Sequence, residues 1–163
     1  MSILVRRINR AKWNQVDIVS DDSSADAITS CLKTTNNDLS TWLIEDENDL
    51  NTAILALITG SRQENLSTIH IIYFDESLIS DKNLNLSITE GDTLIDTFKN
   101  KHRDISELTY SSLGEVKDIV LDCLRNDRFK TITRSKLKTL LKDCIKEELL
   151  EKSSLSDSIQ KIL

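Results

Sequence analysis

The fold is decided by residues 67–76, which read Ser-Thr-Ile-His-Ile-Ile-Tyr-Phe-Asp-Glu. Five residues of this stretch are apolar or aromatic, and three of these are β-branched isoleucines. A strand with one solvated face would alternate between apolar and polar residues, whereas a strand covered on both faces reads as a nearly continuous apolar run. The stretch therefore predicts a strand buried on both faces, at the centre of a sheet.

On the N-terminal side of this stretch, the sequence predicts a strand and then a helix. Residues 39–44 include Trp42 and favour a strand. The helix is indicated by apolar residues at helical spacing, with Gly60 expected as its C-terminal cap: Leu50, Ala53, Ile54, Leu57 and Ile58. Because strand, helix and strand follow one another, we expect residues 39–44 and 67–74 to be parallel neighbours joined by a right-handed crossover.

On the C-terminal side, residues 84–88 alternate between apolar and polar, which is typical of an edge strand. Asp92 is expected to cap a helix that carries Leu94, Ile95 and Phe98 and ends near His102.

The N-terminal segment is apolar and basic. Residues 3–8 predict a second edge strand, because charged side chains discourage unwanted pairing at a sheet edge. Residues 16–19 predict a further short strand, and a helix from about Ser24 to Lys33 follows.

From Ile105 onward the pattern is helical. Ser112 and Glu115 are spaced as a capping box for a helix through Leu124, and a second helix is expected from a cap near Thr133 to Leu149. We therefore predict an α/β fold, with a small mixed sheet and flanking helices in residues 1–104 and an α-helical part in residues 105–163, packed as one compact unit. An α+β arrangement is the alternative.

Composition limits the class of protein. The 163 residues include no Pro and only three Gly, so turns must be made by Asn, Asp and Ser. No apolar run is long enough to span a membrane and the N-terminus has no signal-peptide core, so we expect a cytoplasmic protein. Cys31, Cys123 and Cys144 are odd in number and lie in apolar patterns, which predicts buried thiols.

The net charge of −6 is unevenly distributed along the chain. Residues 1–13 carry four bases and no acid, residues 14–104 carry 6 bases and 17 acids, and residues 105–163 carry 11 bases and 10 acids. The basic segments could therefore meet either the chain's own acidic middle or an outside partner.

The strongest local excess of charge lies between residues 125 and 146. Eight bases stand there against Asp127 and Asp143: Arg125, Arg128, Lys130, Arg134, Lys136, Lys138, Lys142 and Lys146. On the predicted helix, Arg134, Lys138, Lys142 and Lys146 form a file at i, i+4 spacing, where like charges repel. Four interpretations are open: nucleic-acid phosphate bound by a helix–loop–helix, the chain's own acids, an acidic partner protein, or a helix face that is merely solvated.

Three further bases, Arg6, Arg7 and Arg10, precede Trp13. An arginine-rich stretch followed by Trp can clamp phosphates and stack on a base. The alternative is a strand followed by an ordinary buried Trp.

Candidate catalytic residues are few. Asp75 and Glu76 follow the apolar strand at its carboxyl end, where ligands bind in parallel α/β sheets, and His70 lies within it. Asp75 and Glu76 are equally explained as a helix cap, and His70 is better explained as a satisfied or half-exposed histidine of the strand. The sequence contains no Walker loop, nucleophile elbow or metal-ligating motif. It therefore predicts neither a metal nor a cofactor, and it favours a protein that is not an enzyme.

These observations lead to three functional hypotheses. The first is an intracellular accessory or adaptor protein that acts by protein–protein interaction or as a homo-oligomer, for example as a subunit of a bacterial or viral multicomponent system. The second is a nucleic-acid-binding module that uses the basic C-terminal helix with Arg6, Arg7 and Arg10. The third is a small hydrolytic or metal-dependent enzyme at Asp75 and Glu76.

Overall fold

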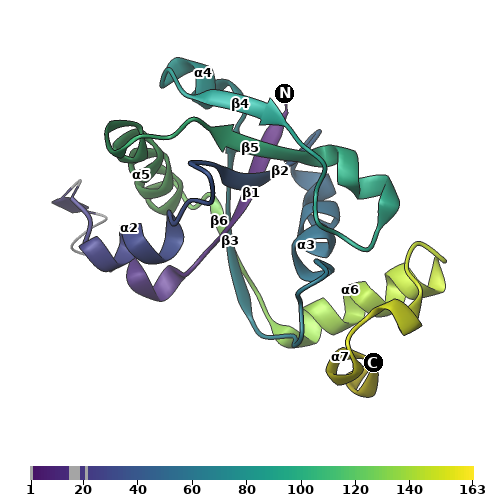
Figure 1. Ribbon diagram of the computed structural model, residues 1–163. Helices are drawn as coiled ribbons and strands as arrows, with labels where there is room; N and C mark the ends of the chain where they lie inside the picture. Colours follow the sequence, from purple (N-terminus) through teal and green to yellow (C-terminus); the bar gives the residue numbers. More distant parts are fainter. Residues whose placement is uncertain (1, 15–18, 21) are drawn as a thin grey trace.

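The computed structural model describes residues 2–14, 19–20 and 22–163 (Figure 1). Residues 16–18 of the short strand predicted at 16–19 lie outside these ranges. The strands are β1 (Ile3–Ile8), β2 (Leu39–Ile44), β3 (Ile69–Asp75), β4 (Asn85–Ile88), β5 (His102–Ser106) and β6 (Phe129–Ile132). The helices are α2 (Ala25–Cys31), α3 (Leu50–Ile58), α4 (Ser77–Asp81), α5 (Tyr110–Arg125), α6 (Arg134–Lys146) and α7 (Asp157–Ile162). Short 3-10 turns are η1 (Arg10–Lys12), η2 (Glu47–Asp49), η3 (Asp96–Lys101) and η4 (Lys152–Ser154).

The six strands form one sheet in the order β4-β5-β2-β1-β3-β6, and every described pairing is antiparallel. The α/β class is confirmed, but the sheet is antiparallel rather than mixed. The predicted parallel pairing of β2 with β3 is wrong, because β1 lies between them and pairs antiparallel with both. β1 is therefore an inner strand and not an edge strand.

β3 is buried on both faces as predicted, although β1 and β2, not β3, occupy the middle of the sheet. Its alternate residues enter two separate hydrophobic clusters. Ile71 and Tyr73 pack with α3, α6 and α7 on one face, and Ile72 and Phe74 pack with α2, α4 and α5 on the other. Figure 1 accordingly shows α5 and α6 on opposite sides of the sheet.

Several predicted elements are confirmed, although α6 ends at Lys146 rather than Leu149. β2 occupies residues 39–44, α3 carries the expected apolar stripe, and β4 is an edge strand. The Thr133 side chain caps α6 by accepting a hydrogen bond from the Lys136 backbone amide. The three cysteines are buried free thiols.

Other local predictions are wrong. α5 begins at Tyr110 and its capping box joins Thr109 with Ser112, not Ser112 with Glu115. The helix expected after Asp92 is the 3-10 turn η3, and the Asp92 carboxylate instead accepts hydrogen bonds from the backbone and hydroxyl of Ser61. His102 begins strand β5, and β6 occupies what was expected to be a link between two helices.

In the described part of the chain, the left-handed backbone positions are occupied without glycine, four of them by the predicted Asn and Asp and two by Glu. Among the described residues, all six with positive φ are Asn36, Asn37, Asn83, Glu107, Asp127 and Glu148. Gly60 does not end α3 in a left-handed conformation, because Thr59 is the C-cap and Gly60 has a negative φ. Within the described chain, no helix combines the length and apolar character needed to cross a membrane.

Candidate functional site

α6 displays a row of bases on a well-anchored helix. Leu137, Leu140, Leu141 and Cys144 are buried against the sheet and fix the helix on that side. A different side carries Arg134, Lys138, Lys142 and Lys146, which we call the basic face of α6. The i, i+4 spacing puts successive members one turn apart, about 6 Å along the axis. Lys138 is half-buried and the other three are exposed.

The basic face of α6 is not neutralised by the chain itself. Within residues 2–14, 19–20 and 22–163, none of its four bases forms an ion pair with an Asp or Glu. Repulsion at i, i+4 costs about 0.2–0.5 kcal/mol per pair in an isolated helix. Burial of the apolar stripe offsets this cost, so α6 holds the four cations in place although they repel one another.

Two other bases of the predicted cluster are used within the fold. The Arg128 guanidinium lies 3.0 Å from the Asp75 carboxylate, and this hydrogen bond raises the pKa of Arg128. The Lys130 ammonium lies 5.5 Å from the centre of the Tyr73 ring, which is within the range of a cation–π interaction. Arg128 and Lys130 both lie outside α6. The row of bases in the predicted cluster that no described acid pairs with is therefore the basic face of α6.

The N-terminal bases do not join the basic face of α6. Arg6 points into the fold, where its two terminal nitrogens donate to the backbone carbonyls of Ser40 (2.6 Å) and Cys31 (2.7 Å). Burial lowers the pKa of Arg6 to about 10, against the opposing effect of Cys31 and Asp104. Arg6 thus links β1 to β2 and caps the C-terminus of α2, where a cation is favoured.

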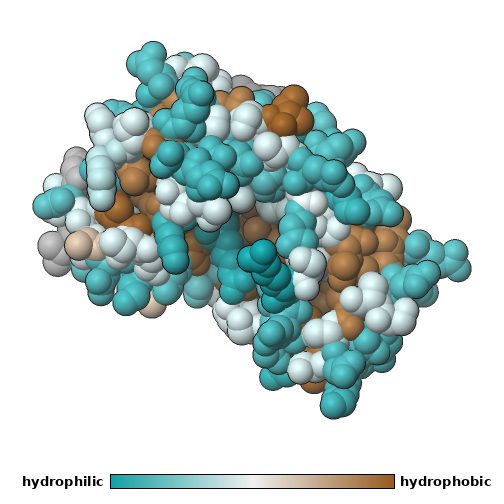
Figure 2. Space-filling model, in the orientation of Figure 1, coloured by the Kyte–Doolittle hydropathy of each residue, from teal (hydrophilic) through white to brown (hydrophobic). Residues whose placement is uncertain are grey.

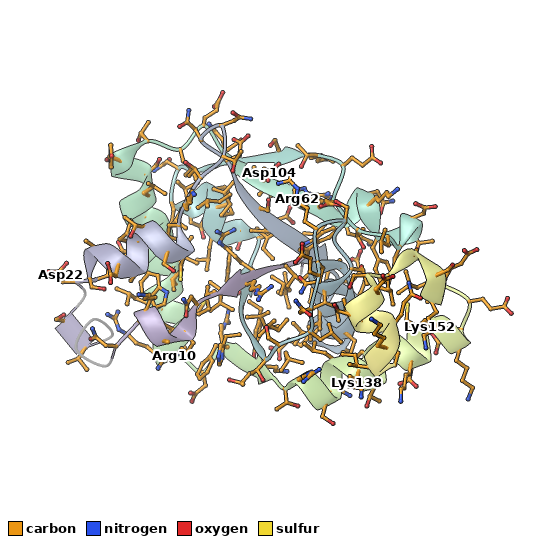
Figure 3. The ribbon with its side chains drawn as sticks, turned by 60° about the horizontal axis from the view of Figure 1, so that its bottom comes forward. Arg10, Asp22, Arg62, Asp104, Lys138 and Lys152 are labelled. Atoms are coloured by element: carbon orange, nitrogen blue, oxygen red, sulfur yellow. The ribbon has the colours of Figure 1, made fainter. Side chains whose placement is uncertain are left out.

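Arg7 is exposed, whereas Arg10 donates to the Trp13 carbonyl and lies over the Phe129 ring at 5.7 Å. Figure 3 shows Arg10 and Lys138 well apart in the view, Arg10 on η1 and Lys138 on α6. Trp13 is fully buried, and its indole nitrogen donates to the Cys31 sulfur at 3.1 Å. Trp13 is therefore a core residue rather than a platform for base stacking.

The helix–loop–helix shape expected for residues 112–149 is wrong. β6 lies between α5 and α6, and the two helices pack on opposite faces of the sheet. They cannot form the compact pair that a helix-turn-helix motif requires.

The structure does not bring the candidate catalytic residues together. Asp75 pairs with Arg128 at one end of β3, whereas His70, near the other end, bonds through Nδ1 to the Thr131 hydroxyl at 3.0 Å. The backbone amide of Glu76 donates to Ser2. Among the described residues, no group of three His, Cys, Asp or Glu side chains is arranged to hold a metal ion.

A partly buried polar network that the sequence did not reveal joins β5 to the loop after β4. The Thr89 hydroxyl lies 2.7 Å from both the Asp104 carboxylate and His102 Nδ1. Since the hydroxyl donates to the carboxylate, His102 Nδ1 must carry a proton and donate to Thr89. The His102 ring also packs edge-on against Trp42, with the two ring centres 5.0 Å apart. His102 Nε2 lies 3.9 Å from the other carboxylate oxygen of Asp104, so the histidine, the threonine and the aspartate hold one another in place, which indicates a structural role.

Acid is expected to destabilise the fold through His102. Burial lowers the pKa of His102 below 6.5, and the charge of Asp104 opposes this effect. The unfolded chain therefore binds a proton at a higher pH than the folded protein does, so the stabilisation is present above about pH 6.5 and is lost as the pH falls through the folded-state pKa.

Thermal unfolding at about pH 7.5 and 5.5 measures this effect. His102→Gln should lose less stability on acidification than the wild type does. His70→Gln is the control, because it removes the half-exposed histidine. An acid shift of the same size in wild type and His102→Gln contradicts the assignment.

A second feature that the sequence did not reveal is an apolar groove of about 590 Å³ between α2 and the start of α5. Ile28, Leu32, Leu108 and Leu113 line it, and Tyr110, which is 97% exposed, stands at its rim. Figure 2 shows hydrophobic surface between these two helices. The groove depends on how two distant helices pack, which no local pattern predicts.

Comparison of the chain with protein-family models, curated proteins and solved structures finds no match.

Proposed function

We propose that this protein is an intracellular accessory or adaptor protein that recognises an acidic surface of another protein through the basic face of α6. One observation supports the proposal above all: four bases stand one turn apart on an anchored helix, and no described acid pairs with them. An acidic partner relieves the repulsion within the row and gains charge-assisted hydrogen bonds.

The surface beside the basic face favours a protein as the partner. Ile145 lies three residues after Lys142 and is only partly buried against the core, and Leu149 is 43% exposed. Leu94 and Leu149 line a groove of about 370 Å³ next to the end of α6, together with the acids Asp96, Glu148 and Glu151. A protein partner can place its acids over the four bases and its apolar residues over Leu94 and Leu149, which a uniformly charged polyanion cannot do. Figure 2 shows apolar surface in this region. Apolar area beside charged side chains is the usual anatomy of a protein–protein interface.

The surrounding charge disfavours nucleic acid. Glu147, Glu148 and Glu151 follow directly after the basic face, so a phosphate backbone that continued past α6 would meet acids. Trp13 is buried, and Arg6 is occupied by two carbonyls. A polyanion that binds by phosphate contacts alone needs a longer basic track than the four residues on α6.

The test uses two labelled probes of similar charge: a helical glutamate-rich peptide of about 20 residues and a short mixed-sequence DNA duplex. Fluorescence anisotropy is measured at about 50 and 200 mM salt. We expect the peptide to bind, and Lys138→Glu with Lys142→Glu to weaken its binding at least about tenfold, because each reversal replaces an attraction by a repulsion.

Lys33→Glu with Arg62→Glu is the matched control, because it makes the same change of charge at two exposed bases in the loops after α2 and α3. This control should bind the peptide nearly as tightly as the wild type does, apart from a small general effect of net charge. Equal loss in both double variants contradicts a site on α6. If the duplex binds in a salt-sensitive way and the peptide does not bind, the proposal is wrong and the nucleic-acid hypothesis is supported.

A further inference from the structure

The two edges of the sheet are protected very differently. β4 and β6 end the sheet on opposite sides, and each has four residues. β6 carries Lys130 and directly follows Arg128, and charges on an edge strand discourage pairing with another chain. Residues 84–89, which contain β4, read Leu-Asn-Leu-Ser-Ile-Thr and hold no charge.

β4 also exposes a large apolar side chain. Ile88 is 77% exposed, whereas Leu86 packs against the cluster that contains α5. Because side chains alternate along a strand, Leu86 and Ile88 lie on the same face of the sheet. Figure 2 shows hydrophobic surface over the end of β4, at the top of the view. An uncharged edge with an exposed β-branched residue is a template for pairing with another strand.

From this edge we infer that two copies of the chain associate through antiparallel pairing of β4 with β4, so that their sheets join into one. A two-fold axis perpendicular to the sheet makes the two β4 strands antiparallel and keeps the α5 face of both copies on the same side. The same surface of each copy is then used, which is an isologous dimer. In one register the two Ser87 residues lie opposite each other, on either side of the axis. Leu86 of each copy then lies opposite Ile88 of the other copy. This register covers the exposed Ile88 side chains with apolar neighbours.

A second copy suits this edge better than an unrelated strand does, because it brings the same uncharged strand, with Leu86 and Ile88 spaced to lie opposite one another. Each copy has a net charge of −6, so the two copies repel one another elsewhere on their surfaces. Residues 84–89 are a neutral stretch, where two backbones can approach without placing like charges together. Pairing of four residues buries less area than stable dimers usually do, so the dimer should depend on concentration.

The dimer leaves the basic face of α6 open in each copy. Figure 1 shows β4 at the top of the molecule and α6 at the bottom, across the sheet. The inference is independent of the proposed partner, because the two surfaces share no residues.

The first experiment is sedimentation equilibrium between about 5 and 500 µM protein. We expect the wild type to change from a mass of 18.5 kDa toward twice that value, about 37 kDa. Ile88→Lys should weaken association at least about tenfold, because it places a charge on the edge. Tyr110→Lys is the control, since it makes the same kind of change at a residue that is 97% exposed on another element.

The second experiment tests the register by cross-linking. Opposite residues of an antiparallel pair are close enough for a disulfide. Ser87→Cys should therefore give a disulfide-linked dimer under mild oxidation, whereas Ser80→Cys, on α4, should not. A wild-type monomer at every concentration, an unchanged association of Ile88→Lys, or equal cross-linking of both cysteine variants overturns the inference.

Discussion

Replacing Trp13 by Ala is expected to lower the free energy of unfolding by about 3–5 kcal/mol, the usual cost of deleting a large buried aromatic side chain. Trp13 is fully buried in the cluster that contains α2 and α5. Its indole nitrogen donates to the Cys31 sulfur, so the side chain holds the N-terminal turn η1 against α2. Urea unfolding followed by circular dichroism measures the loss.

Trp13→Phe separates packing from the indole hydrogen bond. Phe keeps most of the apolar volume and removes only the donor, so we expect a loss of about 1–2 kcal/mol. A loss below about 1 kcal/mol for Trp13→Ala contradicts the buried position of Trp13. That outcome restores the hypothesis of a surface tryptophan that stacks on a base.

Gly91→Ala is expected to cost about 1–3 kcal/mol, because it places a methyl group where the core is already filled. The new Cβ would overlap a ring carbon of Trp42 and lie 2.8 Å from the Cβ of His102. Both rings are buried, and His102 is held by Thr89. Neither ring can move without disturbing the polar network of β5, so the change should also broaden the resonances of both side chains in NMR spectra.

Gly114→Ala is the matched control, and its effect should have the opposite sign. Gly114 lies inside α5, and an added Cβ would meet no atom within 4 Å. Removing a glycine from a helix interior stabilises it by roughly 0.5–1 kcal/mol. If Gly91→Ala is as well tolerated as Gly114→Ala, the close contact between this loop and Trp42 is wrong.

Elements with a long periodic pattern could be predicted from the sequence, and short charged ones could not. The five apolar positions of α3 and the capped stripe of α6 are clear over many residues. β5 contains His102, Arg103 and Asp104 within five residues, so its charges conceal a strand whose only fully apolar residue is Ile105. β6 has four residues, too few to show alternation.

The arginines of β1 favour an edge strand, yet β1 lies inside the sheet. Arg6 is accommodated inside the sheet by the carbonyls of Ser40 and Cys31, which belong to elements more than 20 residues away. Similarly, the excess of bases after residue 124 was visible in the sequence, but the pairing of Arg128 with Asp75 was not. Which charges remain unpaired is decided by tertiary contacts, and those depend on the order of strands.

The central position of β1 determines when the sheet can form during synthesis. Ile8 pairs with His70 and Leu39 pairs with Ile105, so most strand pairs join residues about 60 or more positions apart. A sheet with such non-local pairing folds slowly, because the chain loses the entropy of loop closure before the stabilising contacts form. β1 leaves the ribosome first, yet it has no partner until residues 39–44 follow and gains its second only after residue 75. β1 therefore remains unpaired during much of translation. Over this period the charges of Arg6 and Arg7 disfavour its aggregation.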